Sequence, residues 1–176
     1  MVDFLGQHAI TGTSVLEVGG GVGEISIELL RRGAARAVNL ELSPAYETEA
    51  QRLIREAGVE GRVKRRLLDI AVDGRSVESA DVVVMHRVVC CYPDYERLLT
   101  AAADHARRLL AFSYPAGNAA ARLVIGAENL TFRLRGLRFR AFVHRPERML
   151  AVLRDRGMRN SVVEGGMAWQ FAGLER

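Results

Sequence analysis

The chain has 176 residues, of which 49% are hydrophobic, and this supports one globular domain with its own core. No apolar stretch approaches the roughly 18 residues that a membrane-spanning helix needs, and no signal-peptide pattern is present, so we expect a cytoplasmic protein. The formal net charge is +4, and the 25 basic residues comprise Lys64 and 24 arginines. This arginine bias is typical of a GC-rich bacterial genome, and the charge alone is weak evidence for a nucleic-acid partner.

A glycine-rich loop follows the first expected strand. Residues 15–23 read Val-Leu-Glu-Val-Gly-Gly-Gly-Val-Gly, and a helical run, Glu24 to Arg32, follows at once. Glycine permits the positive φ of such a turn and lets a ligand approach the backbone, and the first amides of the helix are left unpaired there. The pattern predicts a nucleotide-like cofactor at this turn, in preference to a glycine-rich turn without a ligand.

The residues of the loop disfavour two nucleotide motifs. The dinucleotide pattern requires a third glycine at position 24, where Glu24 would place a carboxylate beside a pyrophosphate. The P-loop pattern requires a lysine, which this loop lacks. What remains is an acid, Glu17, two residues before the first of three spaced glycines, Gly19, Gly21 and Gly23. An acidic loop of this kind suits a ligand that carries an amino group. This spacing resembles motif I of the class I S-adenosylmethionine-dependent methyltransferases.

The next elements fit the order of strands and helices in that family. A second strand, Ala35 to Leu40, ends at Glu41, which lies 18 residues after Gly23. A doubly wound fold places the acid that holds the ribose hydroxyls close to this position. A helix from Pro44 to Ala57 follows, with proline in its first turn.

Two more strand ends carry residues of interest. A third strand, Val63 to Leu68, leads into Asp69 and Ile70, and an apolar run typical of a buried parallel strand, Asp81 to Met85, leads into His86-Arg87. In the family that the chain resembles, the acid after the third strand meets the adenine amino group and its apolar neighbour packs on the ring. The resemblance therefore rests on four strand ends in the right order.

The last third of the chain is expected to complete the sheet. The pattern predicts a helix over Tyr95–Arg108, a strand over Leu109–Tyr114, a helix over Pro146–Arg156, and a closing antiparallel pair over Asn160–Glu164 and Ala168–Glu175. The family usually ends its sheet with one antiparallel strand at the edge. The resemblance thus implies an α/β fold with a doubly wound, mostly parallel sheet and an antiparallel final strand, in which Trp169 is a core residue.

The resemblance also implies a function and a cofactor site. The implied activity is transfer of a methyl group from S-adenosylmethionine to a small-molecule acceptor, on oxygen or nitrogen, by in-line displacement, with S-adenosylhomocysteine as the product. A non-catalytic binding scaffold of the same fold and an NAD(P)-dependent oxidoreductase remain as alternatives. The implied cofactor-binding residues are Glu17, Gly19, Gly20, Gly21, Gly23, Glu41, Leu42, Asp69, Ile70 and His86.

The segment after the fourth strand takes the acceptor-side position of the family. It lacks the catalytic Asn-Pro-Pro-Tyr type of motif of the enzymes that methylate amino groups of DNA or the N5 of glutamine. Its Tyr92-Pro93, together with Tyr114-Pro115 after the fifth strand, is distantly similar to magnesium-protoporphyrin O-methyltransferases. His86 and Tyr92 are the catalytic candidates, although a lining role fits His86 better than that of a general base, and His144 is a weaker third. The substrate-binding candidates are Arg87, Tyr92, Tyr114 and Arg122, with an ordinary ion pair as the alternative for Arg87.

No metal site is expected. Cys90 and Cys91 are adjacent, so they cannot easily bridge each other, and they have no His or Cys partners at ligand spacing. We expect both cysteines to be buried near the end of the fourth strand.

Residues 116–144 are longer than a plain connection requires. Their apolar residues recur at helical spacing, and between Arg122 and Arg159 ten arginines face three acids. Three interpretations compete for this basic helical insertion: a helix on the core with solvated arginines, a substrate lid that recognises a carboxylate or phosphate, or a basic surface for a membrane or nucleic acid. Nucleic acid is the least favoured partner, because no aromatic residues alternate with the basic ones.

The segment before the first strand is short, so residues 3–9 can supply at most a small arm over the cofactor. Three arrangements follow: an open pocket, a pocket closed by a second subunit in a homodimer, or one closed by the insertion. A further alternative is that the sequence starts late, as a trimmed domain or from a wrongly assigned start.

Overall fold

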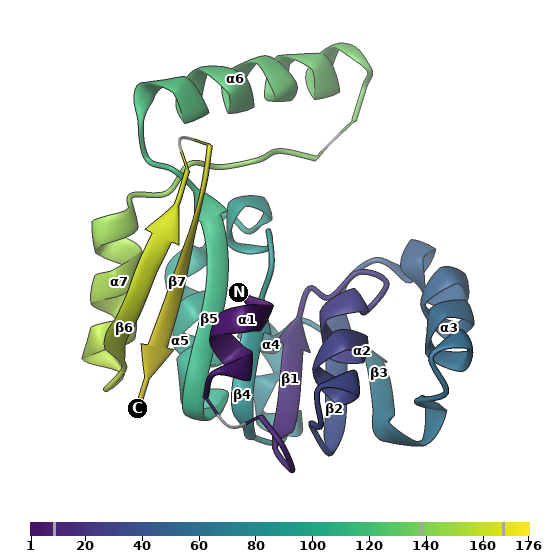
Figure 1. Ribbon diagram of the computed structural model, residues 1–176. Helices are drawn as coiled ribbons and strands as arrows, with labels where there is room; N and C mark the ends of the chain where they lie inside the picture. The colour runs from purple at the N-terminus through teal and green to yellow at the C-terminus, as the bar shows by residue number, and fades with distance from the viewer. Residues whose placement is uncertain (9, 138, 167) are drawn as a thin grey trace.

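The computed structural model describes residues 1–8, 10–137, 139–166 and 168–176 of the chain (Figure 1). Its centre is a seven-stranded sheet with the order β3-β2-β1-β4-β5-β7-β6. Neighbouring strands from β3 to β5 pair in parallel, whereas β7 runs antiparallel to both β5 and β6. The strands are β1 (Ser14–Val18), β2 (Arg36–Glu41), β3 (Val63–Leu67), β4 (Ala80–Met85), β5 (Ala106–Pro115), β6 (Arg159–Gly165) and β7 (Trp169–Glu175).

Helices cover both faces of the sheet, so its central strands are apolar on both sides (Figure 1). One face packs against α1 (Val2–Gly6), α2 (Glu24–Arg31) and α3 (Glu47–Glu56). The other packs against α4 (Ile70–Asp73), α5 (Tyr95–His105) and α7 (Pro146–Asp155). Short 3-10 turns lie at Pro44–Tyr46, Glu60–Arg62, Gly74–Ser76 and Val89–Cys91.

The helix α6 (Ala119–Leu134) is set apart from these two layers. It lies across the end of the sheet, above the carboxyl ends of β4 and β5, and its return segment (residues 139–145) runs beneath it towards α7 (Figure 1). Within the described residues, no helix is both long enough and apolar enough to span a lipid bilayer.

The strand order creates a crevice between the carboxyl ends of β1 and β4. The chain proceeds from β1 outwards to β2 and β3, and then returns to place β4 on the opposite side of β1. The connections from β1 and β4 therefore diverge to opposite sides, which leaves a gap at their carboxyl ends where ligands bind in doubly wound folds. The glycine-rich loop after β1 opens into this gap.

The expected α/β fold with its doubly wound, mostly parallel sheet and antiparallel final strand is confirmed, but three local details were predicted wrongly. The helix predicted over Tyr95–Arg108 ends at His105, because Ala106 pairs with Ala80 and draws residues 106–108 into β5. The antiparallel strand β7 lies between β5 and β6 rather than at the edge. Trp169 is partly exposed at the start of β7 and is not a core residue.

Candidate functional site

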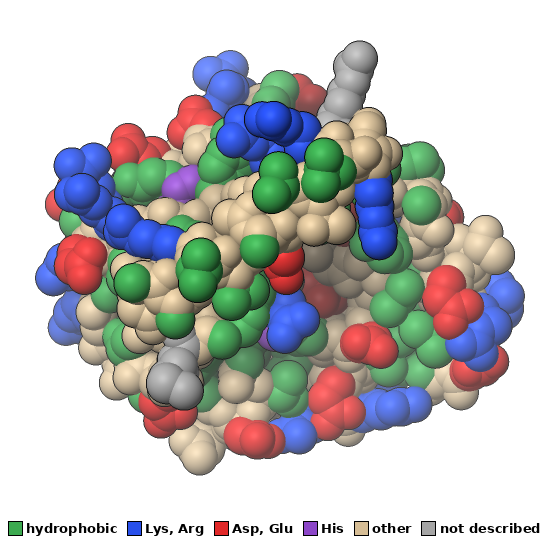
Figure 2. Space-filling model, turned by 90° about the horizontal axis from the view of Figure 1, so that it is seen from above, with side chains coloured by type: hydrophobic (Ala, Val, Ile, Leu, Met, Phe, Trp, Pro, Cys, Tyr) green, Lys and Arg blue, Asp and Glu red, His purple; other side chains and the backbone are tan. Residues whose placement is uncertain are grey.

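A cavity of about 970 Å³ opens at the carboxyl ends of β1, β2 and β4. Figure 2 looks down on this end of the molecule and shows the surface hollowed beside α6. Nine of the predicted site residues line the cavity: Glu17, Gly19, Gly20, Gly21, Glu41, Leu42, His86, Arg87 and Tyr92. They share the wall with residues that were not predicted: Val22, Glu24, Ile25, Ser43, Pro44, Tyr46, Val88, Cys91 and Phe139.

The glycine loop is shaped by close packing underneath and open space above. Gly19, Gly21 and Gly23 have φ values of 63°, 52° and 87°, in the left-handed region that favours glycine. A Cβ on Gly20 would lie 2.1 Å from the Asn39 amide nitrogen, so a side chain there has no room. A Cβ on Gly21 would meet nothing within 4 Å. The loop therefore packs tightly against β2 and presents bare backbone to the cavity at Gly21.

The Glu17 carboxylate is buried beneath this loop and is 2% exposed. Its Oε2 accepts hydrogen bonds from the Ser26 amide (3.1 Å), from the Ser26 hydroxyl and from the Asn39 amide group (3.0 Å). Burial raises the pKa of Glu17, and the hydrogen bonds from Ser26 and Asn39 oppose this shift. Glu17 thus joins β1, β2 and the first turn of α2 under the loop.

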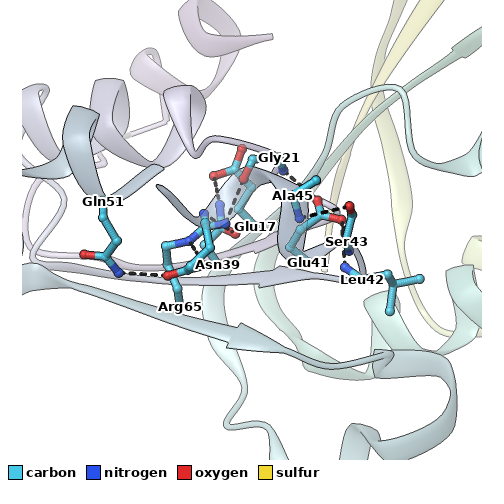
Figure 3. Close-up of polar contacts among 10 residues, drawn as sticks. Glu17, Gly21, Asn39, Glu41, Leu42, Ser43, Ala45, Gln51 and Arg65 are labelled. Carbon is cyan, nitrogen blue, oxygen red and sulfur yellow. Dashed lines mark hydrogen bonds and ion pairs between the residues drawn. The ribbon is translucent and has the colours of Figure 1, made fainter. Parts of the chain in front are cut away.

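Arg65 of β3 completes this arrangement, and its side chain is only 5% exposed (Figure 3). Its guanidinium donates to the Asn39 side-chain oxygen (2.9 Å), to the Gly21 carbonyl (2.9 Å) and to Glu47 Oε2 (3.1 Å). Gly21 is thereby held from below by a charged hydrogen bond, which is stronger than a neutral one.

Glu41 holds the same glycine from the β2 side (Figure 3). Its Oε2 accepts from the Gly21 amide (2.8 Å), and its Oε1 accepts from the Leu42 and Ser43 amides (2.7 and 2.9 Å). Glu41 lines the cavity, and the residue is 9% exposed. The amide and the carbonyl of Gly21 are therefore both fixed by acidic or basic side chains.

The opposite wall of the cavity is formed by His86 and Arg87. Arg87 has a φ of 58°, which is rare for a residue with a side chain, and its amide donates to the Ser113 hydroxyl (2.9 Å). The guanidinium carbon lies 4.8 Å from the centre of the Trp169 ring. Ser113 Oγ also lies 3.0 Å from His86 Nδ1. Burial, and next the charge of Arg87, lower the pKa of His86, so the ring is neutral at pH 7.

Tyr92 links the cavity wall to the end of β3. Its hydroxyl donates to Asp69 Oδ2 (2.8 Å), and Asp69 Oδ1 accepts from the Ala71 amide (2.9 Å) as the cap of α4. Burial, and then this hydrogen bond, raise the pKa of Tyr92 to about 12. Tyr92 therefore carries its proton at neutral pH.

The two cysteines differ in exposure, which corrects the expectation that both are buried. Cys90 is buried, whereas Cys91 is exposed and lines the cavity. Their sulfurs lie 3.5 Å apart, and both thiols donate to the Arg87 carbonyl, because the 3-10 turn at Val89–Cys91 folds back on it. Among the described residues, no three His, Cys, Asp or Glu side chains gather as a metal site.

The structure places the other predicted residues outside the cavity lining. Gly23 caps α2 behind the loop, and Ile70 is buried in the core. Tyr114 is 1% exposed, and its hydroxyl has no hydrogen-bond partner among the described residues. Arg122 is exposed on α6. The binding roles assigned to them and to Asp69 stay predictions.

Sequence reasoning missed Asn39, Arg65, Ser113 and Phe139. A signal existed for the first of these, because Asn39 interrupts the apolar run of residues 37–40 and an amide buried in such a strand requires partners. Arg65 gave no such signal, since it is one of three consecutive basic residues in an edge strand. Which of them turns inward depends on strand register.

Comparison with known proteins identifies relatives of the chain. Residues 15–111 match the family model described as a methyltransferase domain. A magnesium protoporphyrin IX methyltransferase from Synechocystis, solved with bound S-adenosylhomocysteine, aligns with a TM-score of 0.79 and 22% identity over 99% of this chain and 79% of that one. An O-methyltransferase family protein from Burkholderia thailandensis aligns with a TM-score of 0.78 and 20% identity over 100% of this chain and 55% of that one. A methyltransferase from Mesorhizobium loti aligns with a TM-score of 0.75 and 15% identity over 100% of this chain and 98% of that one. A sequence comparison with curated proteins gave no significant match.

The contact between Arg65 and the loop generates a prediction. We expect Arg65→Gln to weaken the affinity for S-adenosylhomocysteine about tenfold, because Gly21 loses its charged hydrogen bond from below. Isothermal titration calorimetry measures this affinity. The matched control is Arg66→Gln, whose guanidinium instead bonds Ser76 at the surface and whose affinity should stay unchanged. Equal affinities for the two variants would show that Arg65 does not position the loop.

Proposed function

The chain belongs to the methyltransferase domain family and is a class I S-adenosylmethionine-dependent methyltransferase, and we propose that it methylates the carboxylate of a small acceptor molecule. The acceptor group and the residues that bind each ligand are the parts of this proposal that go beyond the family. Both rest on the cavity at the carboxyl ends of β1, β2 and β4.

We first propose that the cavity binds the methyl donor along the glycine loop. Its volume of about 970 Å³ suits a ligand of that size, and the bare backbone at Gly21 leaves room for close approach. Glu41 and Leu42 would hold the adenosyl part at the end of β2. Glu24 faces the same cavity and disfavours a ligand with phosphates, so it also weighs against NAD(P). When bound, the donor supplies a methyl group that its sulfonium already activates.

The observation that carries the proposed acceptor is the environment of Arg87. Arg87 lines the cavity, and its guanidinium rests on the Trp169 ring and forms no ion pair with the residues that the structure describes. A planar guanidinium fixed on an aromatic ring presents donors in the geometry that matches a carboxylate. A small anionic acceptor would therefore bind on this side.

The chemistry of the wall is consistent with a carboxylate nucleophile. Such a group is ionised at neutral pH and needs no general base, whereas a phenol or an amine would benefit from one. Tyr92 keeps its proton, since its pKa is raised to about 12. His86 is neutral and belongs to the wall with Ser113. The tasks left to the chain are to orient the acceptor through Arg87 and to exclude water.

We further propose that residues 116–144 act as a lid over the acceptor. Phe139 lines the cavity, and the return segment is tied to the wall where the Phe142 amide donates to the Cys90 carbonyl (2.7 Å). The His144 ring adds a hydrogen bond to the Tyr92 carbonyl (3.1 Å). The Asn129 side chain fastens α6 to this segment through two hydrogen bonds with the Ala141 backbone, each 2.8 Å.

The assignment of the donor site predicts the effect of two substitutions. Glu41→Ala removes the carboxylate that holds the Gly21 amide, and Gly21→Asp places a charged side chain at φ 52° in the cavity. Each should weaken S-adenosylhomocysteine binding by about tenfold or more in calorimetry. Gly58→Asp is the control, because Gly58 has a similar φ of 65° and equally open surroundings but lies outside the cavity lining. Unchanged affinity in both variants would contradict the assignment.

The proposed acceptor predicts the chemical class of the product. The protein is incubated with S-adenosylmethionine carrying a radiolabelled methyl group and with a panel of small carboxylic acids, phenols and amines. Methyl esters release labelled methanol in alkali, whereas methyl ethers and methylamines do not. We expect base-labile label, and label found only in base-stable products would contradict the proposal.

The role of Arg87 is tested with the acceptor found in that panel. Arg87→Met should raise the KM for the acceptor about tenfold or more, because the cation that orients the carboxylate is lost. The affinity for S-adenosylhomocysteine should stay within about twofold, since the donor side is unaffected. Arg154→Met on the exposed side of α7 serves as the control for removal of an arginine.

The pH dependence separates a carboxylate from an acceptor that needs a base. The pKa of His86 is lowered, so the ring gains its charge only as the pH falls below the usual value for histidine. A reaction that used His86 as a base would lose kcat as the pH falls through that pKa. For a carboxylate acceptor we expect the dependence of kcat on pH to be the same in the parent chain and in His86→Asn, both above and below the usual pKa of histidine.

A further inference from the structure

One side of α6 exposes a row of apolar residues. Leu123, Leu130 and Leu134 are 77%, 53% and 78% exposed, and Ala127 lies between them. Their spacing of four, three and four residues places all four on one face of the helix, because a helix turns once in about 3.6 residues. We call these four residues the outer stripe. Singly exposed leucines are common, but a continuous row of them indicates a contact surface.

The opposite side of α6 is the one that packs against the protein. Ala121 and Ile125 are its buried residues, and Ile125 lies about 160° around the helix axis from Leu123. Phe132, on the same side, meets Phe139 of the return segment edge to face, with ring centroids 5.3 Å apart. The outer stripe therefore faces away from the core, and no other described element packs on it.

Arginines flank the outer stripe on both sides. Counted around the helix axis from Leu123, Arg122 and Arg133 lie about 80–100° away on one side of the stripe. Arg135, directly after the last turn, lies about 120° away on the other side. The helix has one acid, Glu128, and none of these three arginines forms an ion pair with a described residue. In the view onto α6 in Figure 2, basic and hydrophobic side chains lie side by side along it.

We propose that the outer stripe of α6 docks on the surface of an anionic lipid bilayer. A helix with an apolar face and flanking arginines lies in the plane of such an interface, with the leucines among the acyl chains and the guanidinium groups extended to the lipid phosphates. The inference goes beyond the methyl transfer reaction and does not rest on the identity of the acceptor.

The same charges argue against a second copy of the chain as the partner. Two copies paired through the outer stripe would bring their flanking arginines together, with only Glu128 of each helix to compensate. Single-stranded nucleic acid would require aromatic side chains on which bases stack, and the outer stripe is aliphatic. An anionic bilayer satisfies the apolar and the basic parts of the surface together.

The test is flotation of the full chain with vesicles. Two kinds are used: phosphatidylcholine mixed with phosphatidylglycerol, and phosphatidylcholine alone. We expect the protein to float with the anionic vesicles, to bind the neutral ones at least about tenfold more weakly, and to be released from the anionic ones by high salt. Replacement of Leu123 and Leu134 by serine should reduce partitioning to the anionic vesicles by about tenfold or more.

Controls keep this outcome separate from loss of the fold and from loss of activity. Leu67→Ser replaces a leucine that is 57% exposed on β3, far from α6, and should bind vesicles like the parent chain. Affinity for S-adenosylhomocysteine should be unchanged in the double serine variant, because the outer stripe is not part of the cavity lining.

Three outcomes would overturn the proposal. The first is no flotation with anionic vesicles, and the second is equal flotation of the parent chain and the double serine variant. The third is a dimer in analytical ultracentrifugation that the double serine variant abolishes, which would assign the outer stripe to a second copy of the chain.

Discussion

The burial of one carboxylate, that of Glu17, constrains the whole end of the molecule at which the cavity opens. The strand register places Glu17 beside Asn39 and Asn39 beside Arg65, so an acid, an amide and a base form a row across β1, β2 and β3. A carboxylate that is almost fully buried is destabilising unless hydrogen bonds and a nearby opposite charge compensate. The row supplies both, and because it lies directly under the glycine loop, the compensation of one charge also fixes the position of the loop.

The glycine loop is consequently held at both polar groups of a single residue. Arg65 donates a hydrogen bond to the Gly21 carbonyl from below, and Glu41 accepts one from the Gly21 amide on the β2 side. A loop with three residues at positive φ would otherwise have many accessible conformations, and ordering it on ligand binding would carry a large entropic penalty. The hydrogen bonds to Gly21 already order the loop when the chain folds, so a ligand would bind to a preformed surface.

The sequence predicted the parts of this arrangement that depend on local pattern. The run of residues 15–23, followed at once by a helix, specifies a strand, a glycine turn and a helix N-terminus, and the acid after β2 follows from its distance along the chain. Register does not follow from local pattern, because a shift of one residue sends Arg65 to the other face of β3 and brings a neighbouring basic residue inward. For the same reason the sequence did not indicate that Ser113 of β5 would meet the residues that follow β4. It also overstated the burial of Trp169, whose ring is partly exposed and stacks with Arg87 instead of entering the core.

The two walls of the cavity differ in how they are held, and this difference agrees with the two roles proposed for them. The proposed donor wall is built from backbone fixed by buried charges, so its shape tolerates few substitutions. On the proposed acceptor wall, Arg87 keeps a left-handed conformation that costs an ordinary residue about 1–3 kcal/mol, offset here by the Ser113 hydrogen bond and the Trp169 ring. Strain that surrounding contacts maintain at a cavity wall is typical of a residue positioned for a ligand. The proposed lid is tied to this wall at Cys90 and Tyr92, so movement of α6 would be transmitted to the proposed acceptor side.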